Sequence, residues 1–209
     1  MGRVVTTERS LSLLLLEDSA ADAELVVEAL RRSGLRVVAE RADTEAAFVA
    51  ALERCAPDVV LSDSSLAAFD PPEAMRVLRA RRPGTPLIVV TGAVREGMAV
   101  SYLRAGAEDL VWKENLGRLA PVLEESLRVR QPLERLSPRQ FDVFRSIAEG
   151  RSTATIALEL KVSVKTVETH RAEVMRRLQV RDLSGLVRYA LRIGLLAADA
   201  GAAGSGFSR

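Results

Sequence analysis

Short apolar runs alternate with segments of helical periodicity along the first two thirds of the chain. Continuous apolar runs are typical of strands buried on both faces of a parallel sheet. We expect such strands at residues 11–16, 36–40, 59–61, 87–90 and 110–112. Between the runs, apolar residues recur every three or four positions, which indicates amphipathic helices. Five repeats with short connections predict an α/β doubly wound fold over residues 11–130.

Local signals mark the ends of two of these helices. Ser33-Gly34 is a typical stop for the first helix. The apolar face of that helix is expected to include Leu25 and Leu30. Asp43 or Thr44 is the expected N-cap of the second helix, because short oxygen-bearing side chains accept hydrogen bonds from the free amides of the first turn.

The pattern changes at Gln131-Pro132, and no strand is predicted after it. Amphipathic helices are expected at residues 138–149, 153–160, 164–178 and 183–193. We therefore expect an all-α second domain over residues 136–197, joined to the first by a linker at 131–135. Residues 198–209 are rich in Ala, Gly and Ser, which predicts a flexible tail.

Charge divides the chain at the same point. Residues 1–130 hold 17 basic and 20 acidic side chains (17 − 20 = −3), and residues 131–209 hold 13 and 8 (13 − 8 = +5), which together give the net charge of +2. An acidic and a basic module suggest different partners, of which the second would be a polyanion.

Composition excludes several classes of protein. The only cysteine, Cys55, cannot form an internal disulfide, and no cluster of Cys and His residues could hold a structural zinc. The early run Leu13–Leu16 is cut off by acidic residues and is too short to cross a membrane or to form a secretion signal. We expect a cytoplasmic protein with no membrane partner.

Polar residues follow four of the expected strands at their carboxyl ends, where open α/β sheets bind ligands. They are Glu17 and Asp18, Asp63, Thr91 and Lys113. Three carboxylates at one place repel one another and are expected to hold a divalent cation, and hard oxygen ligands suit Mg²⁺. A hydroxyl and an ammonium suit phosphoryl oxygens, so the set predicts phosphoryl transfer chemistry.

Residues 11–130 resemble the receiver domain of two-component response regulators. The resemblance lies in the stretches LLLLEDSAADAELV, PDVVLSDSSL, PLIVVTG and LRAGAEDLVWKENL. It implies a flavodoxin-like fold in which Asp63 is the acceptor of a phosphoryl group from a histidine kinase. It also implies that Asp18, Asp63 and the backbone carbonyl of Ser65 bind Mg²⁺, with Glu17 acting through water. Lys113 would pair with the phosphoryl group, and Thr91 would bond to it and shift on activation.

The chain departs from the receiver pattern near the last expected strand. Leu110 stands where receivers carry a switch aromatic residue, and Glu114 follows Lys113 where they carry proline. Phosphorylation chemistry is still expected. The standard relay from Thr91 to an aromatic side chain on that strand, however, has no receiving residue in its usual place.

The second module reads as helix, short turn, helix, with Ser163 as the cap of the second of these helices. Its sequence from Leu136 to Leu196 resembles the LuxR-type DNA-binding domain, and the stretch VKTVETHRAEVMRRL is most similar to the NarL/FixJ class. The resemblance implies a recognition helix at residues 164–178. Its expected base-facing residues are Glu168, Thr169 and Ala172, and its candidates for phosphate or base-edge contacts are Lys165, Thr166, Arg171 and Arg176. Residues 183–193 would pair two copies on double-stranded DNA.

These observations predict a transcription regulator rather than an enzyme, although the receiver would take part in its own Mg²⁺-dependent phosphorylation and dephosphorylation. The expected partners are a histidine kinase, double-stranded DNA and, in the active state, a second copy, with RNA polymerase as a further candidate. The short linker and the opposite charges of the modules favour a resting state in which the first module covers the recognition helix.

Two alternatives stay open at this point. Asp63 would also serve as the nucleophile of a Mg²⁺-dependent phosphatase, but such enzymes place a second Asp two residues on as general acid, and here that position is Ser65. In the other alternative, both folds are kept but the input is a partner protein rather than phosphorylation, for which Leu110 is the only support.

Overall fold

A five-stranded parallel sheet forms the centre of the first module in the computed structural model, which describes residues 10–66, 69–93 and 97–196. The strands are β1 (Leu11–Leu16), β2 (Val37–Ala42), β3 (Val59–Ser62), β4 (Leu87–Thr91) and β5 (Asp109–Trp112). Their order is β2-β1-β3-β4-β5, and every pairing is parallel. The order reverses between β1 and β3, and such a switch point is where doubly wound sheets bind ligands.

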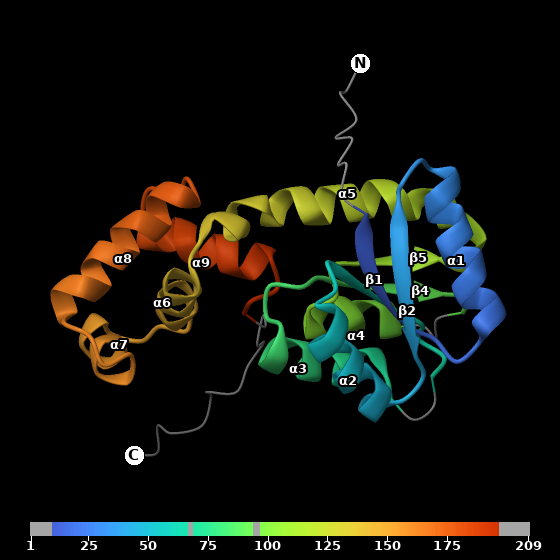
Figure 1. Ribbon diagram of the computed structural model, residues 1–209, viewed down its shortest axis with the longest axis horizontal. Helices are drawn as coiled ribbons and strands as arrows, with labels where there is room; N and C mark the ends of the chain where they lie inside the picture. The colour runs from blue at the N-terminus through green and yellow to red at the C-terminus, as the bar shows by residue number, and fades with distance from the viewer. Residues whose placement is uncertain (1–9, 67–68, 94–96, 197–209) are drawn as a thin grey trace, which may run out of the picture.

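Helices cover both faces of this sheet (Figure 1). One face carries α1 (Ala20–Arg32) and α5 (Leu119–Arg130), and the other carries α2 (Glu45–Cys55), α3 (Pro71–Arg81) and α4 (Met98–Ala105). Side chains alternate along a strand, so Leu13 packs in the cluster with α1 and α5, and Leu14 packs in the cluster with α2, α3 and α4. The uninterrupted apolar run of β1 is therefore explained by burial on both faces.

Two local expectations in this module need correction. Leu25 is 61% exposed, because the buried face of α1 is formed by Ala23, Val26, Val27 and Leu30. The helical periodicity predicts a last helix of this module over residues 116–130. Residues 113–118 instead form a 3₁₀ helix, η1 (Lys113–Arg118), in which Asn115 has a non-helical backbone, so α5 begins at Leu119. The expected cap of α2 is confirmed at Thr44, whose hydroxyl accepts a hydrogen bond from the Ala47 amide.

The second module contains the helices α6 (Pro138–Ala148), α7 (Thr153–Glu159), α8 (Val164–Arg177) and α9 (Leu183–Arg192). Each begins at a side-chain cap, which is Ser137, Ser152, Ser163 or Asp182. Phe144, Ile156, Val167 and Leu186 are fully or almost fully buried in its core. The predicted tail at residues 198–209 lies outside the described residues. Over the described part of the chain, no helix is both long and apolar enough to cross a membrane.

The carboxyl end of α5 connects the two modules (Figure 1). The short 3₁₀ helix η2 (Gln131–Arg135) continues from it, and Val129 is buried in the core of the second module. Arg130 is only 6% exposed and donates from one nitrogen to Glu108 Oε2 at 2.6 Å and to the Ile193 carbonyl at 2.7 Å. One guanidinium therefore holds the start of β5 and the end of α9 together.

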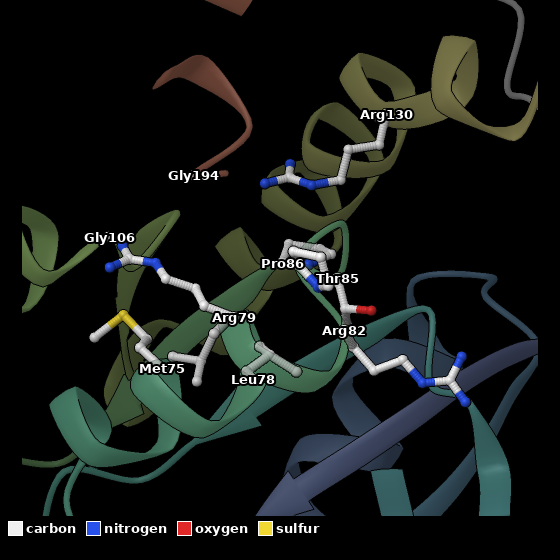
Figure 2. A pocket seen from close by; sticks show the side chains of 11 residues that line it. Met75, Leu78, Arg79, Arg82, Thr85, Pro86, Gly106, Arg130 and Gly194 are labelled. Carbon is white, nitrogen blue, oxygen red and sulfur yellow. The ribbon is translucent and has the colours of Figure 1, made fainter. Parts of the chain in front are cut away.

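A small cavity lies at this junction, and Figure 2 shows Arg130 and Gly194 on one side of it and Arg79 with Gly106 on the other. A side chain at Gly106 would collide with the Arg79 guanidinium, and the residue also has a φ of +102°. A Cβ at Gly194 would lie 3.4 Å from the Gly106 carbonyl oxygen. Gly106 thus makes room for Arg79 within the first module, and Gly194 permits the close approach of the second module to Gly106.

Candidate functional site

The predicted acidic residues meet at the switch point of the sheet. Glu17 and Asp18 follow β1, and Asp63 follows the neighbouring strand β3. One carboxylate oxygen of each of the three residues lies within 4.8 Å of those of the other two. Glu17 and Asp63 are buried, whereas Asp18 is exposed. The structure thus brings together the three carboxylates that the sequence placed at strand ends.

Backbone contacts fix these carboxylates in place. Arg41, at the end of β2, donates to the carbonyl oxygens of Glu17 at 2.9 Å and Asp18 at 3.1 Å. The Ser19 amide donates to Glu17 Oε1 at 3.1 Å, next to the start of α1. The loop after β1 is therefore held from a neighbouring strand and from the following helix.

Lys113 provides the positive charge of the pocket. Its Nζ lies 2.9 Å from Glu17 Oε2, 3.2 Å from Asp63 Oδ2 and 2.5 Å from Asp22 Oδ2. Burial alone would lower the pKa of Lys113, but the hydrogen bonds with Asp22 and Glu17 and the charge of Asp63 outweigh it and raise the pKa above its ordinary value. The ammonium therefore stays charged at neutral pH.

The donor set fits a hard divalent cation. Asp63 Oδ1 is buried and has no hydrogen-bond partner among the described residues. Buried polar atoms are normally satisfied, so an oxygen without a partner beside two other carboxylates is a good ligand for a cation. Burial also raises the pKa of Glu17, partly offset by its hydrogen bond to Lys113. A bound cation would lower the cost of this crowding of negative charge.

Thr91 lies at the end of β4, on the strand next to β3, and is 1% exposed. Its hydrogen bonds are made with residues other than the three carboxylates. Its hydroxyl lies 2.5 Å from Ser64 Oγ and donates to the Ala93 carbonyl at 2.9 Å. Ser65 contacts Asp63 directly through its side chain, because its hydroxyl donates to Asp63 Oδ2. Of the two residues after Asp63, Ser64 therefore contacts Thr91 and Ser65 contacts the Asp63 carboxylate.

Two polar residues of this site were not singled out from the sequence. Asp22 lies in the first turn of α1, where an acidic residue is ordinarily explained by the helix dipole. Ser64 is one of two serines after Asp63, and nothing in their order says which of them points toward β4. Both contacts depend on how the helix and the loop are oriented in the fold, and no sequence motif predicts them.

Asp22→Asn is expected to make the pocket more receptive to a phosphoryl group. The pair with Asp22 holds Lys113, and the hydrogen bond with Lys113 lowers the pKa of Asp22. A partly exposed ion pair contributes up to about 1 kcal/mol, so removing it should raise the affinity for beryllium trifluoride by up to about fivefold. Fluorescence of Trp112, the only tryptophan, can follow that binding.

Glu28→Gln is the matched control, because Glu28 lies on the same helix and pairs with Arg32 at the surface. A loss of affinity in Asp22→Asn would contradict the idea that Asp22 competes for Lys113.

In the second module, α8 packs on α6 and α7 through Val167 and Val174. Six of the seven residues predicted to contact DNA are exposed, namely Lys165, Glu168, Thr169, Arg171, Ala172 and Arg176. The seventh, Thr166, is half-buried. The Thr166 hydroxyl lies 2.8 Å from the capping Ser163. Arg176 is paired with Glu173 at 2.6 Å, which reduces its availability to a phosphate.

The first module does not cover this helix. Figure 1 shows α8 on the side of the second module away from the sheet, and the contacts between modules instead reach the end of α9 through Arg130. The expectation that the first module lies against the recognition helix is therefore wrong for this structure. The reason is the direction of α5, whose end enters the second module beside α9.

A doubly wound sheet with an acidic pocket at its switch point, followed by a helical domain with an exposed basic helix, defines a receiver joined to a helix-turn-helix domain. Residues 13–123 match the family described as response regulator receiver domain, and residues 134–190 match the family described as bacterial regulatory proteins, luxR family. The chain belongs to the response regulators of the NarL/FixJ family.

Relatives cover almost the whole chain. The transcriptional regulatory protein FixJ of Azorhizobium caulinodans is 30% identical over 91% of this chain and 96% of its own length. FixJ of Bradyrhizobium diazoefficiens is 29% identical over 88% of this chain and 96% of its own. The crystal structure of full-length FixJ from B. japonicum, 28% identical, superposes with a TM-score of 0.51 over 88% of this chain and 98% of that one. The chain is a response regulator in which phosphorylation controls transcription.

Proposed function

We propose that Asp63 is the residue that accepts the phosphoryl group from a histidine kinase, and that its phosphorylation controls the binding of α8 to DNA. The observation that carries this proposal is the position of Asp63. Its carboxylate lies at the switch point, 3.2 Å from Lys113 and beside two further carboxylates. A nucleophilic oxygen, a fixed cation and a cation-binding set are the parts that phosphoryl transfer needs.

Mg²⁺ would be held by Glu17, Asp18 and Asp63, together with the backbone carbonyl of Ser65. When bound, it would neutralise charge on the phosphoryl oxygens. Lys113, already charged, would pair with another of those oxygens. Thr91 would donate its hydroxyl to the group once it turns away from its present partners. These roles follow from the residues present and from the family to which the chain belongs.

The phosphatase alternative lacks a general acid. The residue two positions after Asp63 is Ser65, and its hydroxyl donates to Asp63 itself. A serine hydroxyl has no acidic proton to give to a leaving group near neutral pH, whereas a carboxylic acid whose pKa is raised does. The chemistry that remains is the receiver's own slow phosphorylation and dephosphorylation at Asp63.

Mass spectrometry of the full chain tests the proposal. Incubation with Mg²⁺ and a small phosphodonor such as acetyl phosphate should add the mass of one phosphoryl group, and the same mixture with EDTA should not. Peptide mapping should place the modification on Asp63. The absence of any mass gain in the presence of Mg²⁺ would count against Asp63 as acceptor and favour a regulator with a partner protein as its input.

We further propose that α8 enters the major groove of DNA and that two copies bind together when the protein is active. Glu168, Thr169 and Ala172 are exposed on the face that would meet base edges, and Lys165 and Arg171 can reach phosphates. Leu183 and Leu191 are exposed two turns apart on α9, which gives a second copy an apolar surface. Such a regulator would work in the cytoplasm and act on RNA polymerase at promoters.

Substitutions on α8 separate phosphate contacts from base contacts. Lys165→Ala and Arg171→Ala should each weaken binding to all duplexes and reduce the slope of log affinity against log salt by about one unit. Thr169→Ala should instead change the preferred sequence and leave the slope intact. A duplex selected from a random pool by the wild-type protein provides the probe, and filter binding at several salt concentrations gives the slope.

Arg32→Ala is the matched control, because it removes one exposed arginine from α1 in the other module. If both Lys165→Ala and Arg171→Ala bind DNA with the affinity and salt slope of the control, the docking of α8 proposed here is incorrect.

A further inference from the structure

Tyr102 is a buried aromatic residue whose position is not explained by the pocket or by the DNA-binding helix. It lies on α4, is only 3% exposed and is one of two tyrosines in the chain. It packs in the same cluster as Leu110 of β5, with Leu66 and Phe69 of the segment that follows β3. The aromatic ring that receivers carry on the last strand is thus replaced here by a leucine beside a tyrosine from the neighbouring helix.

The Tyr102 hydroxyl is connected to the acidic pocket through Ser64. Burial and the nearby Asp70 carboxylate raise the pKa of the Tyr102 phenol, and a hydrogen bond with the Ser64 side chain partly opposes this effect. Ser64 Oγ in turn lies 2.5 Å from Thr91 Oγ1. Ser64 is also the residue directly after Asp63 in the chain. Thr91, Ser64 and Tyr102 therefore form a row of hydroxyl groups, in which Ser64 contacts Thr91 and has Tyr102 as its neighbour on the other side.

We propose that Tyr102 replaces the missing aromatic residue of β5 and receives the phosphorylation signal from Thr91 through Ser64. The inference rests on the proposed function, because the signal begins with a phosphoryl group on Asp63. Tyr102 acts as a positioning residue and takes no part in the transfer itself.

The physical basis is competition for a single proton donor. The Thr91 hydroxyl has one hydrogen and now donates it to the Ala93 carbonyl, while it accepts from Ser64. A phosphoryl oxygen on Asp63 is a stronger acceptor because it is charged. When Thr91 turns toward it, Ser64 loses its 2.5 Å partner and keeps only the long contact with the Ala93 carbonyl at 3.4 Å. Its hydroxyl is then free to turn to the neighbouring hydroxyl of Tyr102.

This change would alter α4. Tyr102 is the only residue of α4 that is buried, whereas Val100 and Leu103 are exposed on the same helix. A shift of the buried anchor therefore moves the apolar surface of α4 that other molecules meet. In this way the chain connects its pocket to its surface without an aromatic residue at position 110.

Fluorine NMR of the full chain labelled with fluorotyrosine tests the path directly. Only two resonances are expected, and their assignment follows from the one that is absent in Tyr102→Phe. We expect the Tyr102 resonance to shift when Mg²⁺ and acetyl phosphate add one phosphoryl group, and we expect this shift to be lost in Ser64→Ala at equal phosphorylation. Mass spectrometry on the same samples reports the phosphorylation.

The outcomes distinguish the two levels of the proposal. No mass gain in the wild-type protein would overturn both the proposed function and this inference. A complete mass gain with an unmoved Tyr102 resonance would overturn the inference alone. A shift that persists unchanged in Ser64→Ala would also overturn it, because the signal would then bypass the hydroxyl path.

A swap of the aromatic residue provides a functional test. Tyr102→Ala should be phosphorylated at the wild-type rate but lose most of the phosphorylation-dependent gain in affinity for the selected duplex. Adding Leu110→Phe to that variant should restore much of the gain, because the ring then comes from β5. A full gain in Tyr102→Ala alone would overturn the inference. If the alanine variant fails to fold, Tyr102→Phe, which keeps the ring, should show a reduced gain.

Discussion

Replacing Asp63 by asparagine is expected to abolish the uptake of a phosphoryl group and, with it, any phosphorylation-dependent gain in DNA affinity. The amide nitrogen and oxygen of asparagine are poor nucleophiles, and the substitution also removes one of the three carboxylates that surround the candidate Mg²⁺ site. The side chain keeps its size, so the 3.2 Å approach of Lys113 requires no rearrangement of the backbone. Full-length mass spectrometry and DNA binding on the same preparation measure both effects.

Asp70→Asn is the matched control for this experiment. Asp70 caps α3 by accepting a hydrogen bond from the Glu73 amide at 2.9 Å, and asparagine caps helices about as well as aspartate. The control therefore removes one carboxylate from the same segment without loss of a cap, and it should be phosphorylated like the wild-type protein. Undiminished mass gain in Asp63→Asn would show that another residue accepts the group, and Asp18, the exposed carboxylate of the same cluster, would be the first candidate.

The sheet and the carboxylate pocket were predictable because both depend on short-range rules. Continuous apolar runs can be buried on both faces only within a covered parallel sheet, and the observed strands begin and end within two residues of those expected. Polar residues at the carboxyl ends of adjacent parallel strands must then meet at one edge. Glu17, Asp63 and Lys113 could thus be placed together before any contact was known.

The partners of those residues could not be predicted in the same way. Asp22 reaches Lys113 across 91 positions of sequence, and Ser64 reaches Thr91 across 27. Whether a given hydroxyl or carboxylate bridges to its neighbour depends on the rotation of a helix or loop by a fraction of a turn. The exposure of Leu25 has the same cause, because Ala23 and Val27 occupy the buried face of α1.

The arrangement of the modules depends on a contact with no sequence signature. Arg130 is the last residue of α5, and an arginine near a helix end is ordinarily explained by the helix dipole. It is buried because two groups contact its guanidinium, Glu108 and the Ile193 carbonyl, which lie 22 and 63 positions away in the sequence. The linker length and the opposite charges predicted that the first module would lie on the recognition helix, whereas the contacts of Arg130 bring it against the end of α9.

Arg130→Ala is expected to loosen the connection between the modules and to destabilise the protein. The substitution leaves Glu108 without its cation and removes the donor to the Ile193 carbonyl, as well as the bond to Ser126 Oγ at 3.1 Å. Removing one partner of a buried ion pair costs about 3–5 kcal/mol, and because the Glu108 side chain is partly exposed we expect about 3 kcal/mol, the lower end of that range.

Two probes of urea unfolding can detect the effect on each module. Trp112 lies on β5, so its fluorescence reports the first module, whereas circular dichroism reports the helices of both. We expect Arg130→Ala to lower both midpoints and to separate them, because each module then unfolds with less support from the other. Arg128→Ala, which removes an exposed arginine from the same helix turn, should change the free energy of unfolding by no more than about 0.5 kcal/mol.

A double-mutant cycle with Glu108→Gln shows how much of the loss belongs to the ion pair. If Arg130 acts mainly through Glu108, the double variant should be less destabilised than the sum of the two single changes by about 1 kcal/mol or more. Additive losses would mean that the bonds to the Ile193 carbonyl and to Ser126 carry the effect instead. An Arg130→Ala protein that unfolds like Arg128→Ala would contradict any role of this residue in holding α9 against the first module.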